Sequence, residues 1–282
     1  MKRLALAVLA AAGCSTAAPA EKPLYERLGG AHAVAAVVDD FVDRLFLNPT
    51  VMANAAVKEE SAKVTRSGLK FQLAVLVCQV TGGPHQYHGR SMPDSHRGLE
   101  ISEKEWDAMA ADFKVTLDKF RVPAKEQKEL FDIVGTTKPD IVKGPKTAGT
   151  RTPMPRPQGD SLYARLGGVY AIAEIMDVFG KTLGGNATVG ANKTVVERLG
   201  KIPPAASHFQ ATLYFCEITG GPYRYHGKSL KEAHRDLGIT GAEWDAANAD
   251  FKKVLGQLKV GEREQKELIA LVQARRGDVV TR

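Results

Sequence analysis

Cysteine is scarce in this chain: only 3 of the 282 residues are cysteines. Cys14 lies near the N-terminus, and Cys78 and Cys216 lie 138 residues apart in apolar segments. A small fold held together by several disulfides is therefore excluded. We expect Cys78 and Cys216 to be buried free thiols that pack as small hydrophobic side chains and do not bridge each other.

Three further patterns are missing from the sequence. No segment alternates apolar and polar residues between hairpin turns, so the pattern predicts an all-α chain. No basic run is interleaved with aromatic residues, so the net charge of +7 indicates solvated helix faces and no nucleic-acid partner. The apolar run from Leu4 to Ala12 is too short to span a membrane as a helix.

The chain does contain a repeat. Gly82-Gly83-Pro84 recurs as Gly220-Gly221-Pro222, and His96 recurs as His234, in each case 138 residues later. The same offset holds from residue 24 to beyond residue 266, so one unit of about 120 residues occurs twice. Two copies of a domain-sized unit predict a tandem of independent domains and not a solenoid.

The repeat and the composition divide the chain into four parts. The segment between the two copies shows no apolar periodicity and carries three prolines in its second half, which predicts a partly stiff linker. The expected parts are an export leader (1–20), a first domain (21–142), the linker (143–160) and a second domain (161–282).

Apolar residues recur every three or four positions along four segments of the first copy, which predicts four helices. Ser102 with Glu105, and Thr240 with Glu243, form capping boxes at the start of equivalent segments. Gly82 suits the left-handed conformation that ends a helix. The four segments are residues 34–46, 69–80, 106–120 and 130–142.

A histidine follows a helix-start signal in each copy. Ser91 precedes His96, and Ser229 with Glu232 forms a complete capping box before His234. A histidine on a helix is most often a surface residue or a buried residue with satisfied hydrogen bonds. Neutral imidazole is also the commonest axial ligand of haem iron, and spacing alone does not decide between these interpretations.

The order of motifs around these histidines resembles a group I truncated haemoglobin. Leu-Tyr-x-Arg-Leu-Gly-Gly begins at residue 24, Asp-Asp-Phe ends at Phe41, and Gly-Gly-Pro-x-x-Tyr-x-Gly-Arg-Ser-Met leads to His96 and then Ile101-Ser102. The resemblance covers residues 24–142 and 162–280. It implies two all-α truncated-globin domains, each a two-over-two helical sandwich that holds one haem b.

The resemblance also implies roles for single residues. His96 and His234 match the proximal ligands of the haem iron. Such proteins bind diatomic gases, so O2, NO or CO are the expected ligands, with a reductase as a partner. Some oxidise nitric oxide to nitrate; this reaction and a peroxidase-like side activity stay open, and gas binding is favoured over catalysis. The other residues implied to contact the haem or to form the loop before the proximal helix are Phe41, Leu73, Tyr87, Phe179 and Tyr225.

The distal side departs from the family pattern. The family commonly has a tyrosine after the packing phenylalanine, where this chain has Val42 and Gly180. The polar candidates near the gas are Gln72, Gln210 and His208. Without a strong donor, bound oxygen dissociates faster, which argues against oxygen storage and fast nitric oxide dioxygenation.

Two other functions stay open. The chain could be an extracytoplasmic haem electron-transfer or redox-sensing module with His208 as sixth ligand, or a pair of helical interaction modules that have lost haem. His88 and His226 are either surface residues of a loop or helpers near the haem edge. His32 and His85 have no histidine in the second copy and are expected at the surface.

The first 20 residues predict export. Lys2-Arg3 supply the positive start before the short apolar run. Ala18-Pro19-Ala20 fits cleavage and release to the periplasm, whereas Ala11-Ala12-Gly13-Cys14 resembles a bacterial lipoprotein box in which Cys14 is acylated. A fortuitous apolar start is the third interpretation.

Lipid attachment at Cys14 gives the first testable prediction. The protein should sediment with membranes, because a multiply acylated cysteine anchors firmly. Cys14→Ser should abolish processing or move the protein to the soluble fraction, as fractionation and mass spectrometry of the mature N-terminus would show. A soluble mature form that begins at Glu21 would reject the lipoprotein interpretation and leave export alone.

Overall fold

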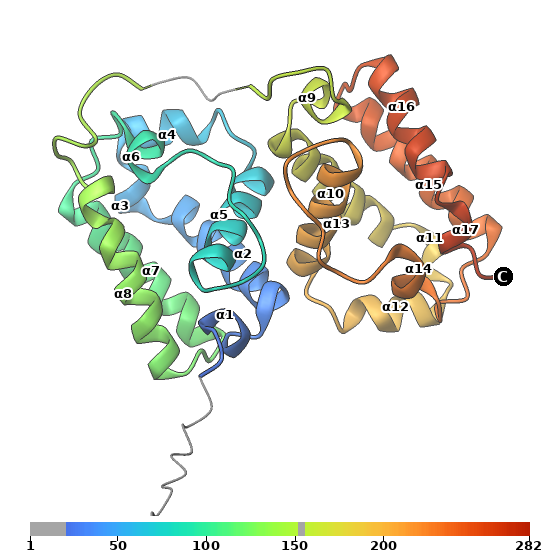
Figure 1. The fold of residues 1–282 in the computed structure, drawn as a ribbon, viewed down its shortest axis with the longest axis horizontal. Helices are drawn as coiled ribbons and strands as arrows, with labels where there is room; N and C mark the ends of the chain where they lie inside the picture. Colours follow the sequence, from blue (N-terminus) through green and yellow to red (C-terminus); the bar gives the residue numbers. More distant parts are fainter. Residues whose placement is uncertain (1–20, 152–155) are drawn as a thin grey trace, which may run out of the picture.

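The computed structural model describes residues 21–151 and 156–282, and all regular elements within these ranges are helices. The predicted leader, its cleavage site and Cys14 lie outside the described residues. Within the two described ranges, no helix is long and apolar enough to cross a membrane. Figure 1 shows two lobes, which correspond to the two copies of the repeat.

The first lobe contains the four predicted helices, each within six residues of its predicted bounds, and four short ones. Its elements are α1 (Leu24–Arg27), α2 (Gly30–Leu47), α3 (Pro49–Met52), α4 (Ala55–Ser61), α5 (Arg66–Val80), α6 (Met92–His96), α7 (Glu103–Lys119) and α8 (Ala124–Ile141).

The second lobe repeats this order and adds one short helix at its end. Its elements are α9 (Leu162–Leu166), α10 (Val169–Gly184), α11 (Ala187–Gly190), α12 (Lys193–Gly200), α13 (Pro204–Ile218), α14 (Leu230–His234), α15 (Gly241–Gln257), α16 (Glu262–Gln273) and α17 (Arg276–Val279).

Local sequence signals explain where these helices begin and end. The capping boxes of Ser102 at α7 and Thr240 at α15 are both formed, with each side chain accepting from the third helical N–H. Gly82 and Gly220 follow α5 and α13 with φ of +86° and +85°, a conformation that costs glycine little. The predicted capping and termination signals are thus confirmed.

The arginine of the repeated Arg-Leu-Gly-Gly motif joins the first helix of each lobe to a late one. Arg27 Nη1 donates to Glu126 Oε1 at 2.6 Å, and its Nη2 pairs with Glu129. Because these carboxylates lie on α8, the cluster closes the domain around α1. The second lobe repeats the cluster with Arg165, Glu264 and Glu267.

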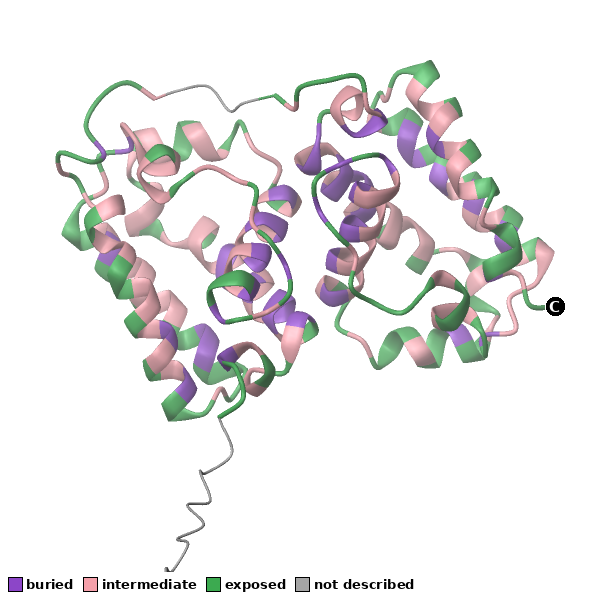
Figure 2. Cartoon of the chain, viewed as in Figure 1, coloured by how far each residue is buried: buried purple, intermediate pink, exposed green. Residues whose placement is uncertain are grey.

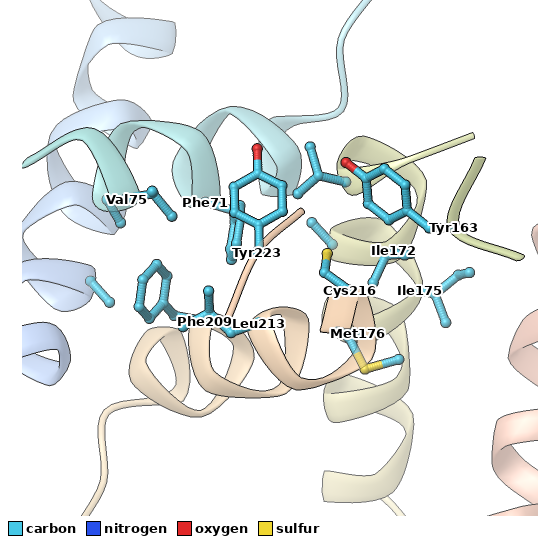
Figure 3. Close-up of a cluster of buried hydrophobic side chains, with 14 of the residues drawn as sticks. Phe71, Val75, Tyr163, Ile172, Ile175, Met176, Phe209, Leu213, Cys216 and Tyr223 are labelled. Carbon is cyan, nitrogen blue, oxygen red and sulfur yellow. The ribbon is translucent and has the colours of Figure 1, made fainter. Parts of the chain in front are cut away.

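The two lobes are not separate in the structure, because they share one core, and independent folding of each copy stays a prediction. Helices α2 and α5 pack against α10 and α13, and Figure 2 shows many of the buried residues on these four helices. One contiguous cluster contains Phe71 and Val75 of the first lobe and Phe209, Leu213 and Tyr223 of the second (Figure 3). Each copy therefore buries part of its apolar surface against the other copy, while α1, α7 and α8 of the first lobe keep a smaller core of their own.

Aromatic contacts across this core follow the repeat. Phe71 meets its own counterpart Phe209 with ring centroids 5.2 Å apart. Phe71 also contacts Tyr223 edge-on at 5.2 Å, and Phe209 contacts His85 edge-on at 5.5 Å. Since positions 71 and 209, and positions 85 and 223, are equivalent, an approximate two-fold axis relates the copies, as in a symmetric dimer.

His85 corrects another expectation. It was predicted at the surface, as His32 was, but only His32 is exposed. The His85 side chain is 4% exposed and packs against Phe209 and, at 5.2 Å, against His226. Burial, with a smaller contribution from His226, lowers the pKa of His85 from 6.5 to about 4, so its imidazole is neutral at neutral pH.

The predicted linker is partly folded onto the first lobe. Gly98 N donates to Thr147 O at 2.9 Å, and Thr147 is buried. Arg151 forms ion pairs with Glu59 at 2.9 Å and Glu60 at 3.4 Å. Residues 147–151 therefore pack against the first lobe and contact the segment that follows α6.

The buried cysteines fulfil their prediction. Cys78 and Cys216 are fully buried free thiols in the shared core. Burial raises the pKa of Cys78 to about 12 and also raises that of Cys216. Both thiols therefore stay protonated and unreactive at neutral pH.

The buried His85 predicts a specific acid sensitivity. Its pKa is lower in the folded chain than the unfolded value of 6.5, so the unfolded state binds the proton first as the pH falls. Stability from this residue is complete above the unfolded pKa and is lost as the pH falls toward the folded one. From about pH 7 to about pH 5 the loss is on the order of 2 kcal/mol of unfolding free energy.

Urea unfolding of wild type and His85→Phe at both pH values measures this difference. The variant should lose less stability on acidification than wild type. His32→Phe, which changes an exposed histidine, is the control and should behave as wild type. Equal acid destabilisation of wild type and His85→Phe would contradict the prediction.

Candidate functional site

A large apolar cavity of about 1530 Å³ lies inside the first lobe and extends toward the lobe interface. Small-molecule pockets usually measure about 300–1,000 Å³, so this cavity has room for a large ligand. Its walls come from α2 to α8 of the first lobe and, at the interface, from α9, the start of α10 and residues 220–223 of the second lobe. Among the apolar side chains that line it are Phe41, Val42, Leu69, Leu73, Met92 and Trp106.

His96 borders this cavity from the end of α6. Ser91 caps the helix by accepting from Asp94 N at 3.3 Å. His96 Nδ1 lies 2.8 Å from Met92 O. A carbonyl oxygen only accepts, so Nδ1 carries the proton and Nε2 carries the lone pair. Burial is the main cause that lowers the pKa of His96, which favours the neutral ring that can bind a metal.

The second lobe repeats this arrangement. His234 Nδ1 lies 2.7 Å from Leu230 O at the end of α14. The predicted capping box of Ser229 and Glu232 is formed, with Ser229 N donating to Glu232 Oε2 at 3.0 Å. Both histidines are therefore held in one tautomer by their own helix, as metal-bound histidines usually are.

The predicted packing phenylalanines occupy equivalent positions. Phe41 lines the cavity and meets Phe113 edge-on with centroids 5.2 Å apart. Phe179 meets Phe251 in the same way at 5.1 Å. The neighbouring Val42 is 1% exposed and adds an apolar surface with no donor.

The predicted loop tyrosines use their hydroxyls within their own loops. Tyr87 OH donates to Arg90 O at 3.0 Å, and Tyr225 OH donates to Lys228 O at 2.9 Å. Each bond spans the loop residues just before the histidine helix. These tyrosines therefore shape the approach to the histidine, and the ring of Tyr87 also lines the cavity.

The distal glutamines have different surroundings. Gln72 is 7% exposed, borders the cavity, and accepts from Tyr223 OH of the second lobe at 2.8 Å. Gln210 has a buried Oε1 without a hydrogen-bond partner among the described residues. Tyr223 was not identified from the sequence, where the only hint is that histidine stands at the equivalent position 85.

His208 lies on the face of α13 that meets the first lobe. Its Nδ1 is 3.3 Å from Asp177 Oδ1. Burial opposes ionisation of Asp177, but hydrogen bonds from His208 and Lys181 outweigh it and lower its pKa to about 2. A Cβ built on Gly180 would lie 2.4 Å from His208 Nε2, so the imidazole fills the space beside Gly180. Ligation of iron by His208 stays a prediction.

Two asparagines that sequence reasoning missed support the histidine segments. Asn54 caps α4 and donates from Nδ2 to Leu99 O at 2.9 Å. Asn192 caps α12 and donates to Leu237 O at 3.0 Å. Leu99 and Leu237 each follow their histidine by three residues, so these bonds position the end of each histidine turn. Their recurrence at the repeat offset was the available signal.

These residues fit a haem. The cavity is apolar and large, and a neutral imidazole with its Nε2 lone pair borders it. Across the described ranges, no group of three or more histidine, cysteine, aspartate or glutamate side chains gathers to hold a bare metal ion. A haem iron needs few protein ligands, because its macrocycle supplies most of them, and a single imidazole suits that requirement.

Comparison with known proteins agrees with this fit. The sequence model of the family described as bacterial-like globin matches residues 23–143 and 161–281. A group 1 truncated haemoglobin of Chlamydomonas moewusii is 28% identical over 149 residues, which cover 51% of this chain and 84% of that protein. One from Nostoc commune is 28% identical over 123 residues, which cover 42% and 96%.

The chain also has a weaker similarity to a solved structure. The truncated haemoglobin of Tetrahymena pyriformis in its Fe(III) form is 22% identical, covers 44% of this chain and all of its own, and has a TM-score of 0.37. The family match spans most of the chain in two segments. The chain therefore belongs to the bacterial-like globin family and carries two truncated-globin domains in tandem.

Proposed function

We propose that this protein binds one haem b in each domain through His96 and His234, and that each haem iron binds O2, NO or CO. Globins bind haem and diatomic gases, and the group 1 truncated haemoglobins among its relatives support this class of function. The observation that carries the proposal is the repeated bond from histidine Nδ1 to a backbone carbonyl, at 2.8 and 2.7 Å.

The side chains would divide the work as follows. Haem, when bound, supplies the iron that takes up the gas. His96 would hold the iron through Nε2, and the bond to Met92 O would keep that nitrogen unprotonated. Phe41, Val42 and Leu73 would pack against the macrocycle and exclude water from its distal face. In the second domain, His234 and Phe179 would do the same.

The haem-to-protein ratio tests this proposal. The wild type should bind two haems, and His96→Ala and His234→Ala should each reduce the ratio by about half, because one axial ligand is lost per change. The double variant should bind none. His32→Ala alters an exposed histidine that does not line the cavity and serves as the control. Full haem retention in the double variant would disprove the assignment.

The distal wall predicts weak retention of oxygen in the first domain. Val42 lines the cavity and cannot donate a hydrogen bond. Val42→Tyr should slow oxygen release from the first domain roughly tenfold, since a hydrogen bond contributes about 1.5 kcal/mol. Val42→Phe, which adds the ring without the hydroxyl, is the matched control. Stopped-flow release rates measure the effect, and equal rates for the Tyr and Phe variants would contradict it.

A second candidate function rests on His208. The imidazole fills the space beside Gly180, the position after the packing phenylalanine. If its Nε2 reaches the iron, the second domain is a haem electron-transfer or redox-sensing module. In His96→Ala, which leaves haem only in the second domain, a six-coordinate low-spin spectrum without added ligand would support this candidate. A five-coordinate spectrum would reject it.

Location and partners follow from the same proposal. The N-terminal signals favour an exported protein, either periplasmic or anchored at Cys14. A reductase would be needed to return oxidised iron to the gas-binding state. The apolar Val42 at the usual tyrosine position favours gas binding over nitric oxide dioxygenation or peroxidase-like turnover, because a valine side chain cannot stabilise charge on bound oxygen.

A further inference from the structure

Tyr223 of the second domain reaches the wall of the first domain's cavity. It lies in the loop between α13 and α14 and is 2% exposed. Its hydroxyl donates to Gln72 Oε1 at 2.8 Å, across 151 residues of sequence, and both residues border the cavity. Burial is the main cause that raises the pKa of Tyr223, so its hydroxyl stays protonated and remains a donor.

We propose that Tyr223 is a positioning residue for the gas site of the other domain: it orients the Gln72 carboxamide in the distal wall of the first cavity. The inference rests on the proposed gas-binding function. Under this proposal, residues of both domains form the gas site of the first domain. The functional unit is then the pair of domains and not the single domain.

The orientation follows from the chemistry of the bond. Tyrosine is the donor, so the oxygen of Gln72 faces the second domain and the NH2 group occupies the other side of the carboxamide. Loss of the hydroxyl would leave a buried acceptor unpaired, which is costly, and the amide would reorient. A fixed NH2 group in the cavity wall can donate toward a bound gas, whereas a rotating one donates less.

Ring packing holds Tyr223 in place for this role. Its ring lies edge-on to Phe71 of α5 at 5.2 Å and to His88 of the first domain's loop at 5.2 Å. Phe71 is the residue before Gln72 on α5. The tyrosine therefore contacts one turn of α5 twice, through its ring at Phe71 and through its hydroxyl at Gln72. These contacts distinguish Tyr223 from the neighbouring Tyr225, whose hydroxyl bonds within its own loop.

The second domain lacks this bond although the backbone repeats. His85 takes the place of Tyr223 and packs on Phe209, the residue before Gln210. His85 Nδ1 and Gln210 Oε1 are both buried without hydrogen-bond partners among the described residues. The influence of one domain on the other therefore runs in one direction. Tyr223 of the second domain orients Gln72 in the first, whereas His85 makes no equivalent bond to Gln210.

The test isolates the first site in the full-length protein. In a His234→Ala background, which leaves haem only in the first domain, Tyr223→Phe should speed oxygen release about two- to tenfold, the range expected for one hydrogen bond. The C–O stretching frequency of bound CO should rise, because less positive potential faces the gas. This readout does not respond to a purely structural weakening of the interface.

Matched variants complete the kinetic test. Tyr214→Phe removes a hydroxyl of α13 that accepts from Arg275 Nε and should leave both readouts unchanged. In Gln72→Leu, Tyr223→Phe should have no further effect. Unchanged release and stretch in Tyr223→Phe, or an equal effect with and without Gln72, would overturn the inference.

A haem-free measurement separates this inference from the haem proposal. In urea unfolding of the haem-free full chain, Tyr223→Phe should lower the folding equilibrium constant about two- to tenfold more when Gln72 is present than in Gln72→Leu. If the effects of Tyr223→Phe and Gln72→Leu on the unfolding free energy are additive, the two side chains do not interact, and the inference is wrong. If the His234→Ala protein binds no haem, the haem proposal fails, while this cycle still decides whether Tyr223 holds Gln72.

Discussion

Helix α5 has to bury two faces at once, and much of the structure depends on this constraint. One face, with Leu69, Leu73 and Leu76, lines the cavity. The other, with Phe71 and Val75, packs into the shared core of the two domains. A helix that is apolar around most of its surface is stable only when both sides are covered. The second side is covered by the other copy of the repeat, and the proposed haem would cover the first.

The shared core explains residues that a single globin domain would leave unexplained. Gly68 lets α5 approach the second domain, because a Cβ there would lie 2.3 Å from Tyr170 Cδ1. Thr65 and Ser67, at the start of α5, donate to Tyr170 O at 3.0 Å and to Glu174 Oε2 at 2.5 Å. The start of the distal helix is thus built partly to meet the second domain.

The two copies keep one backbone and differ where they face each other. Lys70 pairs with Asp39 at 2.7 Å, and its counterpart His208 pairs with the counterpart aspartate, Asp177. Tyr223 makes a bond that His85 does not make. An exact two-fold interface would give two equal sites. These substitutions make the two copies unequal at their interface, while His96 and His234 keep the same geometry.

The sequence by itself determined what depends on short stretches of chain. The helices, the capping boxes of Ser102 and Thr240, and the turn at Gly82 were predicted correctly, because each is set by residues a few positions apart. The repeat and its motifs also identified the family and both histidine helices, which begin with their own caps.

Only the tertiary structure decided the contacts between the copies. The burial of His85, the bond from Tyr223 to Gln72 and the place of His208 beside Gly180 depend on how the helices of the two copies meet. A contact between residues 151 positions apart produces no periodic pattern and no capping signal in the sequence. The type of a side chain also does not show whether another domain covers it. The apolar surface of α5 could be predicted, but its partner could not.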